Sequence, residues 1–219
     1  MQLFLDTADT GQIEQRFSSG LITGVTTNPT LIKKSGRNPQ NVYKQLVDIG
    51  IPDISMEMVA TTEKDYYNFS VEHFRTYGNV ATIKLPCTPI GLKVCKRLST
   101  IGIKVNVTLV FSVSQAILCA IAGATYVSPF IGRMDDNSLN GLGLIGDIAS
   151  LYKLKCMKTK VLAASVRDVQ SVGKAFSLGA DICTVPVGVF DKMADHVLTT
   201  AGVKQFNADF ALINGNGGT

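Results

Sequence analysis

The sequence predicts a single (β/α)8 TIM barrel with an additional C-terminal helix, all in one domain that spans residues 1–219. Two observations support this prediction: short β-branched runs alternate with amphipathic segments eight times, and no linker interrupts them. In addition, Gly50, Gly78, Gly102, Gly123 and Gly179 each follow a helical pattern, as glycine does at helix C-termini. A doubly wound open sheet is the alternative. The length of 219 residues is sufficient for one sizeable core.

The expected strands are short apolar runs that are rich in valine, isoleucine and threonine. They cover residues 3–6, 23–27, 54–58, 80–85, 104–109, 126–130, 160–164 and 182–185.

The expected helices lie between these strands and show helical spacing of their apolar residues. They cover residues 9–19, 38–50, 63–78, 89–102, 112–123, a stretch that ends at 155, 167–179 and 188–198. The segment VKQFNADFALI predicts a further helix over about 202–213, and NGNGGT, residues 214–219, a flexible tail.

Composition excludes several classes of protein. Hydrophobic residues make up 46% and charged residues 17%, which excludes a disordered chain. No apolar run reaches the roughly 18 residues of a membrane span, and the start MQLFLDTAD does not resemble a secretory signal, so we expect a cytoplasmic protein. Net charge is only +4, with scattered basic residues and no tryptophan, so no nucleic-acid partner is expected. Five cysteines without a C-x-x-C pair and only two histidines argue against a zinc site or a histidine triad.

The polar residues in the predicted strands fall on one face of each strand. Asp6, Glu57, Lys84 and Asn106 alternate with apolar neighbours. In a closed barrel, one face of each strand points into the lumen and the other toward the helices. The ionisable groups are therefore expected inside the lumen at its C-terminal mouth, where barrel enzymes have their active sites.

Lys84 ends a buried strand in VATIKLPCT and is the principal candidate for catalysis. Desolvation favours the neutral amine, which attacks carbonyl groups to form a Schiff base. Asp6 and Glu57 are candidate proton carriers for that chemistry. A purely structural ion pair between Lys84 and one of these carboxylates is an equally good interpretation of the spacing alone.

Other segments offer candidates for substrate contacts. Asn28, held extended before Pro29, would present its amide to the mouth. Arg133, Ser165 and Arg167 follow predicted strands and could bind a phosphate group. GLGLIG, residues 141–146, matches a dinucleotide fingerprint but does not follow a strand, so it is interpreted as part of a loop.

These motifs together resemble the transaldolase family, in particular the small subgroup that includes the fructose 6-phosphate aldolases. The resemblance covers nearly the whole chain. It is carried by FLDTAD, GVTTNPTLI, the lysine in IKLP, VNVTLVFS, SPFIGR and LAASVRD. The segment IGRMDDNSLNGLG departs from the family's pattern, which leaves acceptor preference open.

The resemblance implies transfer of a dihydroxyacetone unit between phosphorylated sugars, as in the pentose phosphate pathway, without a metal or organic cofactor. Lys84 would form the Schiff base with the ketose, Glu57 would act through a water near Thr108, and Asp6 would take the proton from the C4 hydroxyl. The implied substrate-binding residues are Thr26, Asn28, Asn106, Ser128, Phe130, Arg133, Ser165 and Arg167.

The resemblance also implies a homo-oligomer, such as a decameric ring, formed through the C-terminal helix. Glu57 and Phe130 stand where the aldolases have glutamine and tyrosine, which favours transfer over release of free dihydroxyacetone. Two alternatives remain: a direct fructose 6-phosphate aldolase, and a non-catalytic barrel that binds phosphorylated sugars through its arginines.

Overall fold

The computed structural model describes the backbone of residues 1–215 and side chains through residue 213. The predicted flexible tail, 214–219, therefore lies mostly outside the described residues. Of the residues in this predicted tail, 214 and 215 belong to the last helix, which extends to Gly215.

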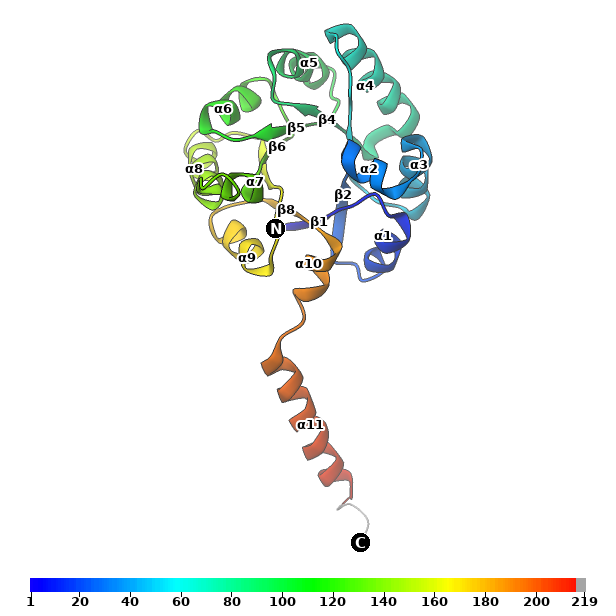
Figure 1. Ribbon diagram of the computed structural model, residues 1–219, viewed down its shortest axis with the longest axis vertical. Helices are drawn as coiled ribbons and strands as arrows, with labels where there is room; N and C mark the ends of the chain where they lie inside the picture. The colour runs from blue at the N-terminus through cyan, green and yellow to red at the C-terminus, as the bar shows by residue number, and fades with distance from the viewer. Residues whose placement is uncertain (216–219) are drawn as a thin grey trace.

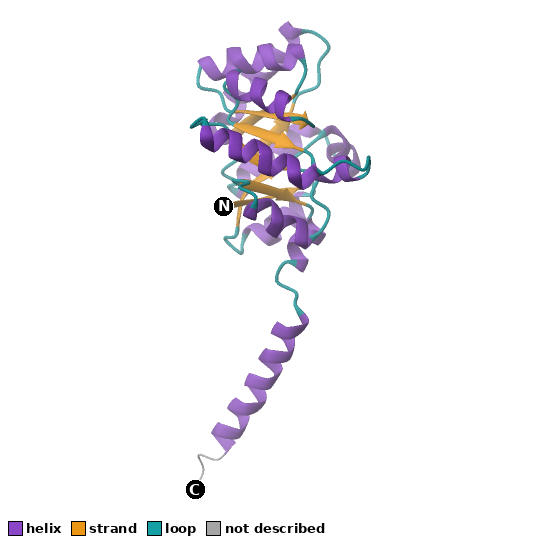
Figure 2. Cartoon of the chain, turned by 90° about the vertical axis from the view of Figure 1, so that its left-hand side faces the viewer, coloured by secondary structure: helices purple, strands orange, loops and turns teal. Residues whose placement is uncertain are grey.

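Eight parallel strands form a closed barrel in which each strand pairs with the next and β8 pairs with β1. Figure 1 shows the strands inside a ring of helices, and Figure 2 shows the same two layers from the side. The predicted fold class is confirmed, and each predicted strand agrees with the structure to within one residue at either end. The strands are β1 (Gln2–Asp6), β2 (Ile22–Thr26), β3 (Ile54–Glu57), β4 (Ala81–Pro86), β5 (Val105–Val110), β6 (Tyr126–Pro129), β7 (Lys160–Ala163) and β8 (Ile182–Val185).

Successive side chains of each strand point alternately toward the helices and into the lumen, which gives the barrel two separate cores. Outward residues such as Leu5, Met56, Ile83 and Val107 are fully buried in the large core between strands and helices. A second, smaller cluster occupies the lumen, with Phe4 and Tyr126 among its members. Burial of the outward apolar surface stabilises the fold by roughly 1.5–3 kcal/mol for each large side chain.

Below the mouth, side chains fill the lumen of the barrel, and the polar side chains among them are hydrogen-bonded. The rings of Phe4 and Tyr126 meet edge to face at 6.2 Å, and Gly24 leaves the space for Phe4, because a Cβ there would lie 2.6 Å from the ring. Asp53 accepts hydrogen bonds from Thr82 (2.8 Å) and Tyr126 (2.9 Å), and it pairs with Lys104 at 2.8 Å. This cluster satisfies polar groups that would otherwise be buried without partners.

The helices lie around the barrel. Most begin at a side-chain cap, such as Asp9, Thr62 or Asp168, whose oxygen accepts a backbone N–H of the first turn. They are α1 (Thr10–Phe17), α2 (Pro29–Ser35), α3 (Pro39–Ile49), α4 (Glu63–Tyr77), the short 3-10 helix η1 (Gly78–Val80), α5 (Pro89–Thr100), α6 (Val113–Ile121), α7 (Ile131–Asp135), α8 (Gly141–Leu154), α9 (Val169–Ser177), α10 (Val187–Lys192) and α11 (Val197–Gly215).

Four helical segments differ from the prediction. The two short helices α2 and α7 have too few residues to show a period. The prediction that GLGLIG is a loop is wrong: it forms the first turns of α8, capped by Asn140. The predicted helix 188–198 is also wrong as one unit, because α10 ends at Lys192 and α11 begins at Val197.

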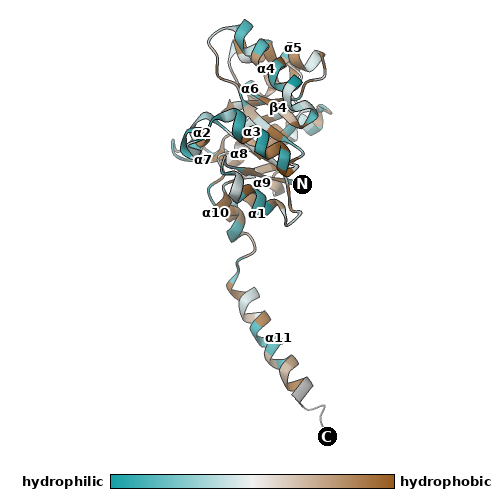
Figure 3. Cartoon of the chain, turned by 90° about the vertical axis from the view of Figure 1, so that its right-hand side faces the viewer, coloured by the Kyte–Doolittle hydropathy of each residue, from teal (hydrophilic) through white to brown (hydrophobic). Residues whose placement is uncertain are grey.

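Helix α11 projects away from the barrel, beyond α10 (Figures 1 and 2). It begins about five residues before the predicted start at 202. Its surface mixes polar and apolar residues (Figure 3), and Phe206, Phe210 and Ile213 are each more than 60% exposed. Within residues 1–215, none of the helices is both long and apolar enough to cross a membrane.

Candidate active site

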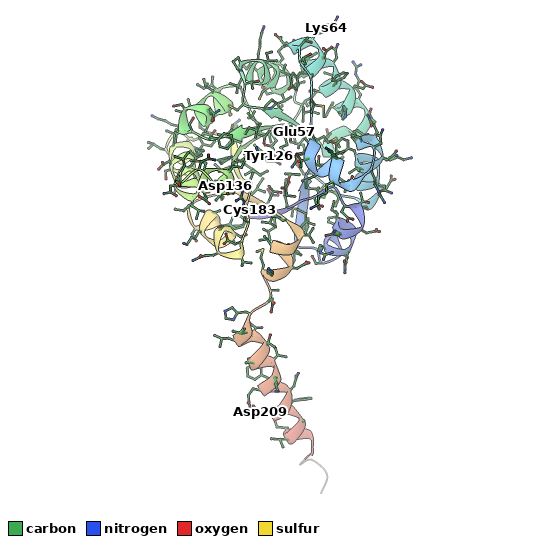
Figure 4. All side chains as sticks on the ribbon, viewed as in Figure 1. Glu57, Lys64, Tyr126, Asp136, Cys183 and Asp209 are labelled. Atoms are coloured by element: carbon green, nitrogen blue, oxygen red, sulfur yellow. The ribbon has the colours of Figure 1, made fainter. Side chains whose placement is uncertain are left out.

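A cavity of about 240 Å³ lies at the C-terminal ends of the strands. Figure 4 shows Glu57 inside the ring of helices, whereas Lys64 lies at the outer edge of the ring, on α4, and Asp209 lies beyond it on α11. Ten of the predicted site residues line this cavity: Asp6, Thr26, Asn28, Glu57, Lys84, Thr108, Ser128, Phe130, Arg133 and Ser165.

Lys84 and Glu57 face each other on neighbouring strands. They are direct register partners in β4 and β3, which places the Lys84 Nζ 2.9 Å from the Glu57 Oε2. The ammonium also donates to the carbonyl oxygen of Thr27 at 2.9 Å. Lys84 is only 5% exposed and lines the cavity, so solvent and ligands reach its amine through the cavity. A lysine amine and a carboxylate at this distance can exchange a proton, and a lysine that has lost its proton can attack a carbonyl group.

Asp6, at the end of β1, supplies the second carboxylate. It accepts a hydrogen bond from the Thr26 hydroxyl at 2.7 Å, and that hydroxyl also lies 2.7 Å from the hydroxyl of Thr184. Burial raises the pKa of Asp6 above its ordinary value, although the positive charge of Lys84 and the bond from Thr26 oppose the shift. Asp6 therefore holds a proton more readily than a carboxyl in water. Asp9, not Asp6, caps the helix that follows.

Thr108, on β5, is the register partner of Pro86, two residues beyond Lys84 in β4. Among the described residues, its hydroxyl oxygen is the one buried side-chain polar atom without a hydrogen-bond partner. Because a buried hydroxyl without a partner is destabilising, this oxygen is suited to hold a water or substrate oxygen in the cavity.

Asn106, the register partner of Lys84, is fully buried and does not line the cavity. Its amide donates to the Ser55 hydroxyl at 3.1 Å, and its carbonyl oxygen accepts from the Ser128 hydroxyl at 2.6 Å. The structure therefore places Asn106 where it orients Ser128, which does line the cavity. Asn28 lines the cavity as predicted, but its side-chain oxygen also caps α2 by accepting from Leu31 N–H at 2.9 Å.

Two of the three predicted phosphate-site residues reach the cavity. The Arg133 guanidinium lies 4.8 Å above the ring of Phe130, and Ser165 adopts a left-handed conformation (φ 57°) at the mouth. Arg167 does not line the cavity: it forms a two-pronged ion pair with Asp136, in the turn after α7. The Asp136 pairing was not predicted, because the two residues are 31 positions apart.

Several lining residues were missed by the sequence analysis. Leu162, Ala164 and Thr184 come from β7, the residue after it, and β8. These two strands have no acidic or basic residue near their C-terminal ends, where the sequence analysis looked for site residues. The position of these three residues on the lumen face follows from the same alternation of side chains that identified Asp6, so the sequence pattern was sufficient to predict them. Within the described part of the chain, no three His, Cys, Asp or Glu side chains are grouped so that they could hold a metal ion.

Comparison with known proteins gives one consistent result. The family model described as transaldolase/fructose-6-phosphate aldolase matches residues 3–215. A probable transaldolase of Anaeromyxobacter sp. (strain K) is 46% identical over 212 residues, which cover 96% of each chain. A probable transaldolase of Paracoccus denitrificans is 47% identical over 211 residues, covering 96% of this chain and 97% of its own. One of Nitrosopumilus maritimus is 46% identical over 213 residues, covering 96% and 95%.

Proposed function

The chain belongs to the transaldolase/fructose-6-phosphate aldolase family, and on this premise we propose that it is a cytoplasmic transaldolase of the pentose phosphate pathway. It transfers a dihydroxyacetone unit from fructose 6-phosphate or sedoheptulose 7-phosphate to erythrose 4-phosphate or glyceraldehyde 3-phosphate. The observation that carries the proposal is the Lys84–Glu57 pair at 2.9 Å in the wall of a cavity that Asp6 also lines.

In the proposed reaction, Lys84 attacks the C2 carbonyl of the ketose phosphate. The ammonium must first lose a proton, and the Glu57 carboxylate is in position to accept it. Glu57 then returns a proton, through a water held by the free hydroxyl of Thr108, to remove the C2 oxygen as water and form the Schiff base. The first of these steps uses two groups that are already within hydrogen-bond distance, at 2.9 Å.

Asp6 then removes the proton from the C4 hydroxyl. The C3–C4 bond breaks, its electrons move into the iminium, and the aldose phosphate leaves. The raised pKa of Asp6 supports this role, because a carboxylate that binds a proton more strongly is a better general base. The three-carbon unit stays on Lys84 as an enamine, and it adds to the next aldose phosphate by the reverse steps.

Borohydride reduction in the presence of fructose 6-phosphate tests the covalent step. The reduced three-carbon adduct is expected on the peptide that contains Lys84, and mass spectrometry reads both its mass and its position. A phosphosugar-binding barrel without catalysis would give no adduct. A direct aldolase would give the same adduct but would release free dihydroxyacetone without an acceptor, so that product is measured with and without erythrose 4-phosphate.

Glu57 and Phe130 are proposed to decide between transfer and release. Phe130 lines the cavity and has no hydroxyl to position a proton or water at the bound three-carbon unit. The double variant Glu57→Gln with Phe130→Tyr is expected to release free dihydroxyacetone at least about tenfold faster, since a positioned acid or water adds a proton-transfer route. Product analysis by coupled assay measures this rate.

The matched control for this variant is Phe111→Tyr. Phe111 contacts the ring of Phe130 edge to face at 5.6 Å but does not line the cavity. It should leave the ratio of products unchanged. An unchanged ratio in the double variant as well would refute the roles given to Glu57 and Phe130.

Arg167 is proposed to bind the substrate phosphate after exchanging its Asp136 partner for the phosphate. Arg167→Ala is expected to raise KM for phosphorylated substrates about tenfold, the scale of one charge-assisted contact, and to leave KM for an unphosphorylated acceptor unchanged. Asp136→Asn should lower KM or leave it the same, because it frees the guanidinium. Arg75→Ala, at an exposed position on α4, is the control. Equal KM values for Arg167→Ala and wild type would remove Arg167 from the site.

We also propose that the protein is a homo-oligomer, such as a decameric ring, with α11 as the contact. Exposed Phe206 and Phe210 support this, since a folded chain rarely leaves such side chains in water without a partner. Changing both to serine in the full chain is expected to give smaller particles by analytical ultracentrifugation. An unchanged sedimentation coefficient would exclude these side chains from the interface.

A further inference from the structure

Two free cysteines outside the cavity lie close together. Cys87 follows β4, Cys119 lies in α6, and their sulfur atoms are 3.7 Å apart. Their positions in the chain differ by 32 residues, so the packing of neighbouring β/α units, not local sequence, brings them together. A disulfide has a sulfur–sulfur length of about 2.05 Å, so the two thiols need only a short approach to become bonded.

The two thiols differ in ionisation and in access. Cys119 is fully buried, whereas Cys87 is partly exposed. The hydrogen bond between them lowers the pKa of Cys87, and the same bond together with burial raises the pKa of Cys119. Cys87 is therefore the thiol that ionises more readily and is accessible to small molecules in solution. Cys119 remains protonated next to it. This is the arrangement of an attacking and a resolving cysteine.

The other three cysteines lack this arrangement. Cys95 and Cys183 are buried, their thiols face the carbonyl oxygens of Ala122 and Val172, and burial raises the pKa of each to about 12. Cys156 is exposed at the end of α8. These three residues are internal controls for any chemistry at the pair.

The pair is connected to the active site through the backbone. The N–H of Cys87 donates to the carbonyl oxygen of Thr108 at 2.8 Å, and Lys84 lies three residues earlier on the same strand. A shift of the Cys87 backbone toward α6 would therefore act on this hydrogen bond at the end of β5. Thr108 and Lys84 both line the cavity, so a displacement there changes the geometry of the site.

We propose that Cys87 and Cys119 form a reversible disulfide when the protein meets a hydroperoxide. The Cys87 thiolate attacks the terminal peroxide oxygen, the O–O bond breaks, and the leaving oxygen takes a proton from water, which leaves a sulfenic acid on Cys87. The Cys119 sulfur then displaces hydroxide from that sulfur, and the thiol proton joins it as water. The two thiols lose two electrons and the hydroperoxide gains them. An external thiol reverses the reaction by exchange.

Mass spectrometry after hydrogen peroxide treatment tests the bond directly. The full-length reduced protein is treated, alkylated, digested without reductant and searched for cross-linked peptides. A Cys87–Cys119 peptide that disappears after dithiothreitol is expected in wild type and in Cys156→Ser. It should be absent from Cys87→Ser and from Cys119→Ala, with circular dichroism used to verify that both variants fold. A cross-link to Cys95, or Cys87 oxidised with no cross-link, would overturn the proposal.

The dihydroxyacetone transfer rate gives a second readout, which rests on the proposed function. The cross-linked protein is expected to turn over about tenfold more slowly, because displacements near 1 Å at a catalytic site have effects of that size or larger. Cys87→Ser should keep the basal rate and lose the sensitivity to peroxide. An unchanged rate in fully cross-linked protein would overturn the coupling to Thr108. Absence of transfer in the reduced protein would contradict the proposed function alone, since the cross-link is read by mass.

Discussion

Lys84→Met is expected to lower kcat/KM for dihydroxyacetone transfer by roughly 10⁶-fold, the scale seen when a covalent nucleophile is removed. Methionine has a similar volume but no amine, so the ketose can enter the cavity without forming a Schiff base. Steady-state coupled assays measure the rate, and borohydride trapping should give no adduct. Loss of a general acid or base alone lowers the rate by about 10²–10⁴-fold. A variant that keeps more than about a hundredth of the activity would therefore show that Lys84 is not the nucleophile.

The chain supplies a matched control for this experiment. Lys104 also pairs with a carboxylate facing the lumen, Asp53, at 2.8 Å, but neither residue lines the cavity. Lys104→Met should therefore lose stability while keeping the borohydride adduct and the transfer rate per folded molecule. If both variants lose activity equally, the loss comes from the barrel's stability and not from Schiff-base chemistry.

Asp53→Ala is expected to give the largest loss of stability, about 3 kcal/mol in the free energy of unfolding. The substitution removes the one acceptor shared by Thr82, Lys104 and Tyr126, and two of these three side chains are buried. Lys104 is partly exposed and can turn toward water, which keeps the loss below that of a fully buried ion pair. Urea denaturation followed by circular dichroism measures the change.

Asp147→Ala is the control for Asp53→Ala. Asp147 lies exposed on α8, and surface substitutions of this kind change stability by about 0.5 kcal/mol or less. Equal unfolding free energies for Asp53→Ala and Asp147→Ala would show that the hydrogen bonds at the base of the lumen do not stabilise the fold. Activity per folded molecule should be unchanged in both, since neither residue lines the cavity.

Helices were predicted less completely than strands, for a physical reason that α7 and α8 illustrate. A helix shows itself in sequence only when several turns carry a repeating apolar face. Helix α7 has five residues, and the glycines at the start of α8 weaken its pattern. The close packing of Gly141 against the backbone of Ile131, where a Cβ would lie 2.5 Å from the carbonyl oxygen, accounts for glycine there, and no local pattern reveals it.

Alternation of side chains along each strand was sufficient to assign Asp6, Glu57 and Lys84 to the lumen. This direction is a local property of extended backbone, and the common orientation of parallel strands brings their C-terminal ends to one mouth. The pattern of the sequence by itself thus predicted the barrel, with a doubly wound sheet as the alternative, and the lumen face of the strands. The resemblance to a known family supplied several further cavity residues, such as Thr108 and Ser128. The pattern left open whether Lys84 forms an ion pair or a Schiff base, and the resemblance to a known family favoured the second.

Only the tertiary structure decided which side chains meet. Lys84 faces Glu57 because β3 and β4 pair in one register, and Thr108 is left without a partner by the same geometry. Arg167 forms an ion pair with Asp136, 31 residues away in the sequence. Cys87 lies next to Cys119, 32 residues away. Such contacts depend on strand register, barrel closure and the docking of helices. Local patterns fix the direction of each side chain, but distances of a few ångströms between distant residues arise only once the chain is packed.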